Sequence, residues 1–590
     1  MARVLRILYE ILLIGIVAFA VLAFGGTKPW TWLVIELGVA LALVIWALRQ
    51  AFEGRISYVK TPLNLLVLLL LALILFQMLP LPTGLIRRVQ PNTATLYTVG
   101  PPHAAAMLGD AAATSRRFAS LSLNREVTRS HFFLYLSYAG LFFLLLNTIT
   151  TRQQLARMVA TVLVVGGVVA LSGLATASEE ERLLYRMYPV GGPDEHPTFL
   201  NADANPEFSA GYGFVFPYKE RETAVTAELP EDQKKEVSDL VTQFSDKDPA
   251  VRRQAVLRLI EIGPGVLPQV QKALDQPGVS PEVREACQTV LNVLAKGVDW
   301  FVPKVHGGDV FGGFPSSNSA ATVLLMTVCL GLGVFFAYIS TRRTEWKNSG
   351  GLFYSHEGNI TMLMVIVVGL LVFALVLTKS RGALGCLVPM ALLTIVLCAF
   401  SRSWLTGLIT LAVLAGLVIV PVAVIGPHEV AGFINEKAAW YLNPWDDVRL
   451  LARESSMQMF RDFPVFGTGL ATYASVYPLY KTGGPMMYFA HCDVLQWMAE
   501  MGLAGSGLAL LILLTGLGTV VWGWIRLKDS FFRRLLVGSA VGCAAFLAHG
   551  LVDFPLQIPG VAVVFVTMAA ICVIVARDQV ARHEEHDFIF

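Results

Sequence analysis

Long, continuously apolar runs dominate the hydrophobic pattern of this chain, and polar residues are concentrated between them. A bilayer core of about 30 Å takes about 20 apolar residues as a helix. The runs do not alternate between apolar and polar positions, so they predict helices rather than the strands of a barrel. Twelve segments meet this criterion: 7–24, 30–48, 62–79, 131–149, 155–175, 318–340, 360–378, 383–400, 404–425, 494–524, 535–552 and 558–576. The tenth is longer than a bilayer needs, which suggests that it begins outside the hydrocarbon.

Composition supports this interpretation. Of the 590 residues, 55% are hydrophobic and only 15% are charged, whereas soluble domains carry roughly 25% charged residues. The seven cysteines include no CxxC pair, which argues against a zinc site or a disulfide framework. A net charge of +2 provides no overall field that would attract nucleic acid. The sequence therefore predicts an all-α polytopic membrane protein without a nucleic-acid partner.

The distribution of Lys and Arg between the predicted spans indicates orientation. Twelve spans place both termini on one side, and the short loops of that side hold the excess of basic residues. The positive-inside rule then places both termini in the cytoplasm of a multi-pass plasma-membrane protein. Residues 1–24 begin with basic residues but lack a small-residue cleavage site, so they predict a first span rather than a cleaved signal.

The spans divide the chain into six regions. One long segment facing outward, 177–317, contains charged helical sequence over 231–297, where Val251, Ala255 and Leu259 share a face. This pattern is similar to HEAT repeats, and it is either a spacer or a docking surface for a protein partner. The predicted regions are 1–176 (membrane helices 1–5), 177–317 (the extracytoplasmic insert), 318–425 (helices 6–9), 426–490 (an outer catalytic loop), 491–577 (helices 10–12) and 578–590 (a cytoplasmic tail).

Basic residues occur where two of the outer loops meet the membrane. In "LTKSRGALG", Lys379 and Arg381 lie in a very short connection, so Arg381 lies close to a helix start. A guanidinium at a helix N-terminus favours anion binding, although an arginine that merely reaches the interface is the alternative. Arg449 and Arg453 are four residues apart, so on a helix they share a face and could hold one doubly charged group. The alternative there is a solvated basic face.

A histidine also lies at this rim. His491 begins the tenth span beside Asp493 in "AHCDVLQWMAEMGLAG", and its ordinary pKa suits a general base near neutrality. An interfacial histidine bonded to backbone is the alternative. His549 and Asp553 are four residues apart near the same face of the membrane. They either support the site as a pair or form a structural bond between the ends of two spans.

These segments together resemble a known family. "TKSRGALG", "DVRLLARESSMQMFRDFPVFGTGLATY", "AHCDVLQWMAEMGLAG" and "AHGLVDFPLQIPG" are similar to signature regions of the O-antigen ligase and O-antigen polymerase family. "PLPTGLIRRVQPNTATLY" in the first outer loop and the Asn-containing entry "FGGFPSSNSAATVLLM" also resemble it. The resemblance covers nearly the whole chain except residues 187–305.

The resemblance implies a glycosyltransferase-like ligase or polymerase. Such proteins take a glycan from undecaprenyl diphosphate and join it to a hydroxyl of a lipid, glycan or protein acceptor. It implies that His491 is the base and that Arg381 and Arg449 bind the diphosphate, with no cofactor and no metal. The further residues that it places at the substrate or in support are Arg453, Lys379, Asn318, Asp493, His549 and Asp553.

Three positions depart from the family pattern. Arg453 stands where Trp is common, Cys492 where Asn is common, and Ser319 where His often follows the asparagine. These changes affect the supports of the charged residues, so they bear on efficiency rather than on the class of reaction.

Other functions fit some of the same features. A flippase or transporter of lipid-linked sugars would also span the membrane many times, but transporters usually carry internal repeats and charges near the midplane. A scaffold would use the insert and need far fewer spans. Ligase and polymerase activities remain alternatives within the first interpretation.

Overall fold

The computed structural model describes most of the membrane helices and their connections. The described residues are 2–54, 57–94, 118–177, 183–184, 188–189, 231–246, 311–346, 356–399, 449–480 and 487–577, with scattered positions between 251 and 290. The chain forms two compact units, one of Met1–His196 with Pro303–Phe590 and one of Pro197–Val302. The first unit contains all the apolar helices described below.

Nine helices in the described ranges are long and apolar enough to cross a membrane, and two shorter apolar helices accompany them. They confirm an all-α polytopic membrane protein and match eleven of the predicted segments. The remaining predicted segment, 404–425, lies outside the described residues. The long helices are α2 (Pro29–Glu53), α7 (Arg125–Thr148), α8 (Arg152–Ala177), α15 (Ser317–Trp346), α16 (His356–Leu377), α17 (Arg381–Ala399), α22 (Asp493–Arg526), α23 (Ser530–His549) and α24 (Pro559–Ala576), and the shorter ones are α1 (Ala2–Leu22) and α3 (Pro62–Met78).

Local sequence explains several of the helix starts. The Thr61 hydroxyl accepts a hydrogen bond from the Leu63 amide, and Pro62 occupies the first position of α3, where its missing N–H costs nothing. Asp529 accepts from the Phe531 amide at the start of α23, and Pro559 opens α24. Within the described residues the strands form two antiparallel pairs, β1 (Leu81–Pro82) with β2 (Phe118–Ala119) and β3 (Leu183–Leu184) with β4 (Tyr188–Pro189).

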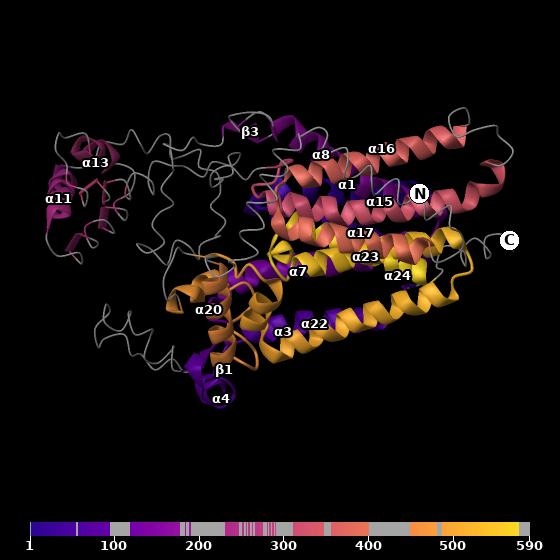
Figure 1. The fold of residues 1–590 in the computed structure, drawn as a ribbon. Helices are drawn as coiled ribbons and strands as arrows, with labels where there is room; N and C mark the ends of the chain where they lie inside the picture. Colours follow the sequence, from indigo (N-terminus) through magenta and orange to yellow (C-terminus); the bar gives the residue numbers. More distant parts are fainter. Residues whose placement is uncertain are drawn as a thin grey trace. The chain divides into compact units, whose positions relative to one another are not determined.

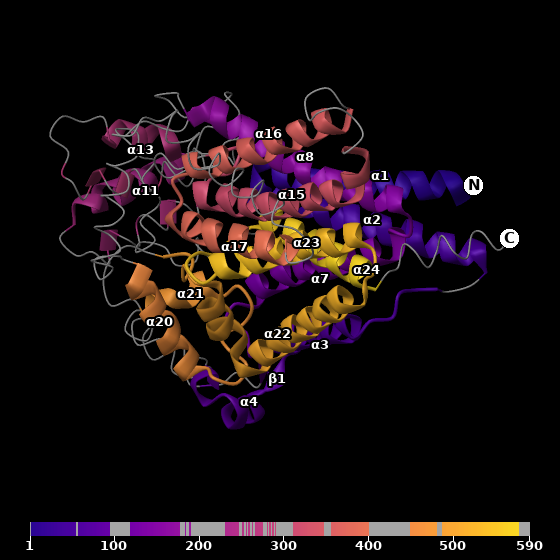
Figure 2. The same cartoon turned by 45° about the vertical axis from the view of Figure 1, so that its right-hand side comes forward.

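Helix α15 forms the centre of the membrane unit. It packs along α23 and also contacts α16 and α17 (Figures 1 and 2). The two central helices touch where Gly333 faces Gly538, and a Cβ built on Gly333 would lie only 2.6 Å from the Gly538 Cα. Small residues allow membrane helices to approach this closely, so Gly333 and Gly538 set the close approach of α15 and α23 at this point.

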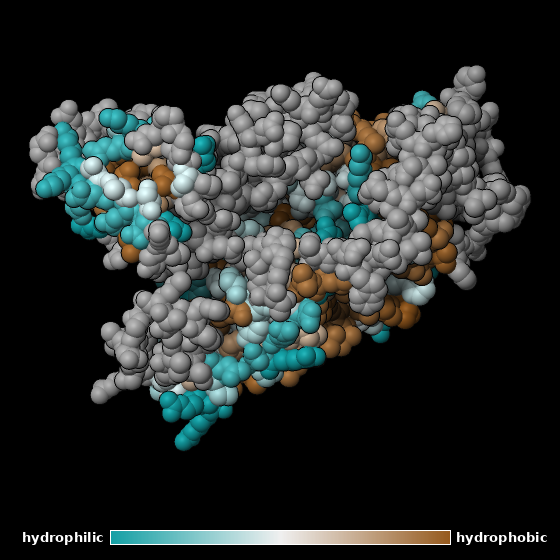
Figure 3. Space-filling view, turned by 60° about the vertical axis from the view of Figure 1, so that its left-hand side comes forward, coloured by the Kyte–Doolittle hydropathy of each residue, from teal (hydrophilic) through white to brown (hydrophobic). Residues whose placement is uncertain are grey.

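The outward faces of the helices are apolar. Leu65, Val164, Leu363 and Leu517 are each about 60% exposed. In Figure 3 side chains of this kind form brown areas along the visible face of the helices. Lipid tails rather than water are the solvent that such a surface requires.

Helix α22 changes direction near its start. Gly502 has φ 60° and ψ −163°, which is not helical, so a short first segment from Asp493 is joined at a kink to the longer apolar part. This agrees with the expectation that the overlong tenth segment begins before the membrane-spanning part.

Residues 311–314, "FGGF", attach the chain to the bundle just before α15. Phe311 and Phe314 exchange backbone hydrogen bonds of 3.2 and 2.9 Å. The Phe311 ring lies against Gly173 of α8, and the Phe314 ring lies against Gly25 of the 3₁₀ turn η1 (Phe24–Gly26), where a Cβ would have no room.

The second unit has an apolar core of its own. Its described helices include α11 (Glu231–Thr242) and α13 (Leu267–Leu274). Of the residues predicted to share a face, Ala255 and Leu259 are fully buried and Val251 is half-buried. The similarity of 231–297 to HEAT repeats, and the boundaries of the predicted regions, remain predictions.

Candidate functional site

The candidate site is formed by segments far apart in the sequence. Helix α20 (Arg449–Asp462), the turn before α22, and the turn after α23 converge at one end of the membrane unit. Figures 1 and 2 show α20 at the end opposite to the start of α1. Each of the nine residues named from the sequence lies in a described range, and most of them meet here.

His491 is held in an unusual backbone conformation. Its φ is 49°, in the left-handed region that residues other than glycine rarely occupy. The Arg453 Nη2 atom donates a hydrogen bond of 3.1 Å to the His491 carbonyl oxygen, and the edge of the imidazole meets the Phe554 ring at 4.9 Å between centroids. These contacts fix the ring, whose Nδ1 lies 3.6 Å from Asp553 Oδ1.

Asp553 lies between two histidines. Its second oxygen, Oδ2, is 3.9 Å from Nε2 of His549, and both side chains are nearly inaccessible to solvent. The other nitrogen of His549, Nδ1, is 2.7 Å from the Thr322 hydroxyl of α15. The same hydroxyl lies 3.0 Å from the Asn318 carbonyl oxygen one turn earlier. The central helix therefore reaches the site through Thr322, and Asn318 lies one helical turn before Thr322.

The electrostatic environment keeps Asp553 ionised. Burial raises the pKa of the Asp553 carboxyl group. The nearby His491, His549 and Arg449 side chains lower the pKa by more than burial raises it, so it lies below its usual range. Asp553 is therefore a carboxylate at neutral pH, and Arg449 lies close enough to act on it.

Arg381 lies at the start of α17, beside the site. It is the first residue of that helix, and the next residue, Gly382, lies against the His549 imidazole, because a Cβ at Gly382 would be 2.9 Å from His549 Nε2. The helix start thus lies beside the histidine pair. Lys379 has φ 55° in the tight turn before α17 and is exposed.

Asp493 holds the turn that carries Asp553. The Asp493 amide donates to the Gly550 and Asp553 carbonyl oxygens at 2.7 and 3.2 Å. Its carboxylate accepts from the Leu556 amide at 2.9 Å and from the Gln557 side chain at 3.4 Å. Asp553 thus lies beside the His491 ring. Asp493 contacts the backbone of the turn that carries Asp553.

The sequence interpretation missed three contributors. Thr322 and Phe554 touch the histidines and carry no charge, so no pattern singled them out. Glu500 is buried and accepts hydrogen bonds from the Ala471 and Tyr473 amides at 2.7 and 3.2 Å. The Tyr473 hydroxyl in turn donates to the Ala452 carbonyl oxygen of α20 at 3.2 Å. A carboxylate inside an apolar run is the signal that could have identified this support.

The described residues contain no group of three or more His, Cys, Asp and Glu side chains arranged to hold a metal ion. What they do contain is an imidazole beside a buried carboxylate, with arginines on the neighbouring helix starts. This arrangement can accept a proton and hold an anion.

The fold and this cluster define a multi-pass membrane protein with a polar site at one end of its helix bundle. Residues 366–510 match the family model described as O-antigen ligase. This segment is therefore similar to the O-antigen ligase family, in agreement with the resemblance found in the sequence. The match includes Arg381, Arg449 and His491, whereas His549 and Asp553 lie beyond it. No curated protein matches the chain.

Proposed function

We propose that this protein transfers a glycan from undecaprenyl diphosphate to a hydroxyl of an acceptor at the outer face of a bacterial plasma membrane. The observation that carries the proposal is the convergence of His491, Asp553 and the start of α20. Both termini then lie in the cytoplasm, in agreement with the basic residues of the loops on that side.

In this mechanism His491 is the general base. Because Nδ1 faces Asp553, Nε2 is the nitrogen that takes the acceptor proton. The Asp553 carboxylate stabilises the imidazolium that forms, as an acid beside a catalytic histidine does in other enzymes. The acceptor oxygen bonds to the sugar anomeric carbon, the bond from that carbon to the diphosphate breaks, and undecaprenyl diphosphate leaves.

The arginines hold the donor. Arg381 and Arg449 bind the diphosphate, whose negative charge increases as the bond to the sugar breaks, so fixed guanidinium groups favour the transition state. Arg453 positions His491 through the backbone contact, while Lys379 and Asn318 contribute at the edges of the substrate site. The same chemistry serves a ligase, which joins a finished glycan to an acceptor, and a polymerase, which lengthens the glycan.

The decisive experiment compares His491→Gln with His131→Gln in purified protein given a glycan on undecaprenyl diphosphate. Removing a general base lowers the rate roughly 10²–10⁴-fold, so we expect such a loss of transfer with donor binding retained. His131 lies on α7, where its Nδ1 contacts the Val127 carbonyl oxygen, and its substitution controls for loss of a histidine elsewhere in the bundle.

Two outcomes would contradict the proposal. If His491→Gln transfers glycan at the wild-type rate, His491 is not the base. If the wild-type protein moves the lipid-linked glycan between leaflets in vesicles without joining it to an acceptor, the chain is a transporter.

A further inference from the structure

A cavity of about 480 Å³ lies at the other end of the membrane unit from His491. Helices α22 and α24 both start beside the candidate site, and the cavity is formed where they end, next to the start of α3. It is therefore distinct from the site proposed for transfer. Its lining residues are Thr61, Pro62, Thr515, Gly518, Thr519, Trp522 and Arg577.

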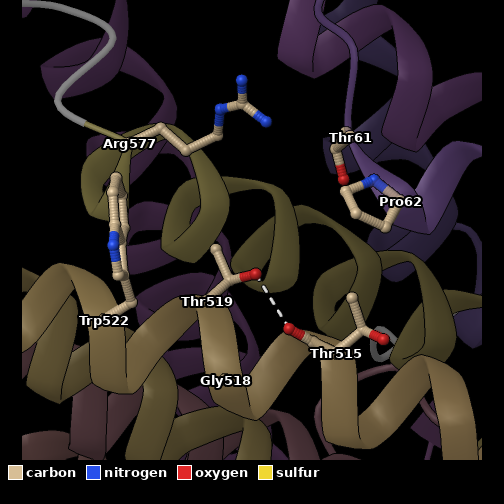
Figure 4. A pocket seen from close by; sticks show the side chains of 7 residues that line it. All are labelled: Thr61, Pro62, Thr515, Gly518, Thr519, Trp522 and Arg577. Atoms are coloured by element: carbon tan, nitrogen blue, oxygen red, sulfur yellow. Dashed lines mark hydrogen bonds between the residues drawn. The ribbon is translucent and has the colours of Figure 1, made fainter.

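Figure 4 shows how these residues enclose the space. Arg577 extends over it from the end of α24, Thr61 and Pro62 bound the opposite side, and the side chains of Thr515 and Thr519 point toward it from α22. A Cβ built on Gly518 would meet no atom within 4 Å, so this glycine leaves the space open.

The mouth of the cavity is basic and aromatic. The Arg577 Nη1 atom donates a hydrogen bond of 2.7 Å to the backbone carbonyl oxygen of Lys60, which holds the guanidinium at the mouth. A second cation, Arg526, stacks on Trp522 with its guanidinium carbon 4.8 Å from the ring centroid. Arginine and tryptophan of this kind mark the level of lipid headgroups.

Below the mouth the surroundings become apolar. Thr515 lies seven residues before Trp522 on α22, which is roughly 10 Å along a helix. Leu511, which lies one turn before Thr515 on the same face of α22, is 50% exposed. A ligand that satisfies both parts has an anionic head and a hydrocarbon tail.

We propose that this cavity binds an anionic phospholipid. Its phosphate lies at the Arg577 guanidinium, and one acyl chain follows α22 past Gly518 toward Thr515. Free phosphate would leave the apolar part unused, and a zwitterionic lipid would gain less from the two arginines.

The test exploits two glycines of α22. Gly518→Leu fills the cavity, whereas Gly516→Leu adds the same side chain at a position that is also open but does not line it. We expect native mass spectrometry with added phosphatidylglycerol to show bound lipid on wild-type protein and on Gly516→Leu, and a loss of several-fold on Gly518→Leu. Glycan transfer measured on the same samples should be unchanged in both variants.

A charge variant supplies the second measurement. Arg577→Gln should abolish the preference for phosphatidylglycerol over phosphatidylcholine. Arg157→Gln, which removes an arginine paired with Glu10 on another part of the bundle, should leave that preference intact.

Three results would overturn the proposal. They are equal lipid binding by Gly518→Leu and Gly516→Leu, equal retention of phosphatidylglycerol and phosphatidylcholine by wild-type protein, and displacement of phosphatidylglycerol from this cavity by undecaprenyl phosphate or by inorganic phosphate.

Discussion

Helices α15 and α22 have nearly the same hydropathy and opposite surroundings. Their most apolar stretches have mean hydropathies of 2.3 and 2.1, yet 94% of that stretch is buried in α15 and 6% in α22. Figures 1 and 2 show α15 among other helices and α22 beside α3 at the edge of the bundle. In a membrane protein, the hydropathy of a helix thus indicates that it lies in the apolar bilayer, but not whether it is buried inside the protein. Gly333 in the middle of α15 packs against the backbone of α23, whereas Gly507, Gly516 and Gly518 of α22 have open space around them.

The largest effect is expected where α15 meets α23. Gly333→Leu would place a side chain against the backbone of Gly538 and the Arg534 carbonyl oxygen, which no rotamer can avoid. Overpacking usually costs about 1–3 kcal/mol and occasionally more, and here two helices must separate. We expect no monodisperse protein in detergent, measured by size-exclusion chromatography. Gly516→Leu on α22 is the control, and equal behaviour of the two variants would mean that the central contact does not limit packing.

Glu500 is expected to make the next largest contribution, although it belongs to the exposed helix. Glu500→Ala removes the acceptor of the Ala471 and Tyr473 amides, and each buried N–H left unsatisfied costs about 1–3 kcal/mol. Glu500→Gln keeps one acceptor oxygen and should lose less. Thermal unfolding in detergent measures both variants. A melting temperature of Glu500→Ala that matches the wild type would show that the loop from 467 to 473 does not depend on this carboxylate.

The kink of α22 ranks third. Gly502→Ala introduces a Cβ at φ 60° that meets the Val465 carbonyl oxygen. Strained backbone of this kind costs roughly 1–3 kcal/mol per residue, so we expect a lower melting temperature. Gly507→Ala, at a position of α22 with open space around it, should be neutral or stabilising. If both alanines had the same effect, the kink would not require glycine.

The smallest effect is expected at Thr322 of α15. Thr322→Val keeps the shape of the side chain and removes the hydroxyl that bonds His549, a loss of about 1 kcal/mol. Because His549 lies beside Asp553 and not beside the acceptor, glycan transfer should fall several-fold, with the protein still folded. Thr322→Ser should restore the rate. Equal rates of the valine and serine variants would exclude a positioning role for this bond.

Much of this arrangement could be predicted from sequence, and the reason is physical. Apolar runs predicted the helices because only helices satisfy their own backbone in lipid. Arg381, Arg449 and His491 were proposed as site residues because ionisable side chains at a membrane are costly. Thr322 and Phe554 were missed, since an uncharged side chain shows its role only through the partner that folding brings to it. The long-range contact of Gly382 with His549 was hidden for the same reason.

The paired phenylalanines of residues 311–314 have a consequence for biogenesis. Chains are made from the N-terminus, so α1 and α8 are synthesised before the second unit and long before α15. Until then the surfaces beside Gly25 and Gly173 are unfilled, and the central position of the bundle has no occupant. Phe311 and Phe314 follow in the chain immediately ahead of α15, and in the folded protein their rings lie against those glycines. We therefore expect these two contacts to fix the position of the start of α15 along the earlier helices.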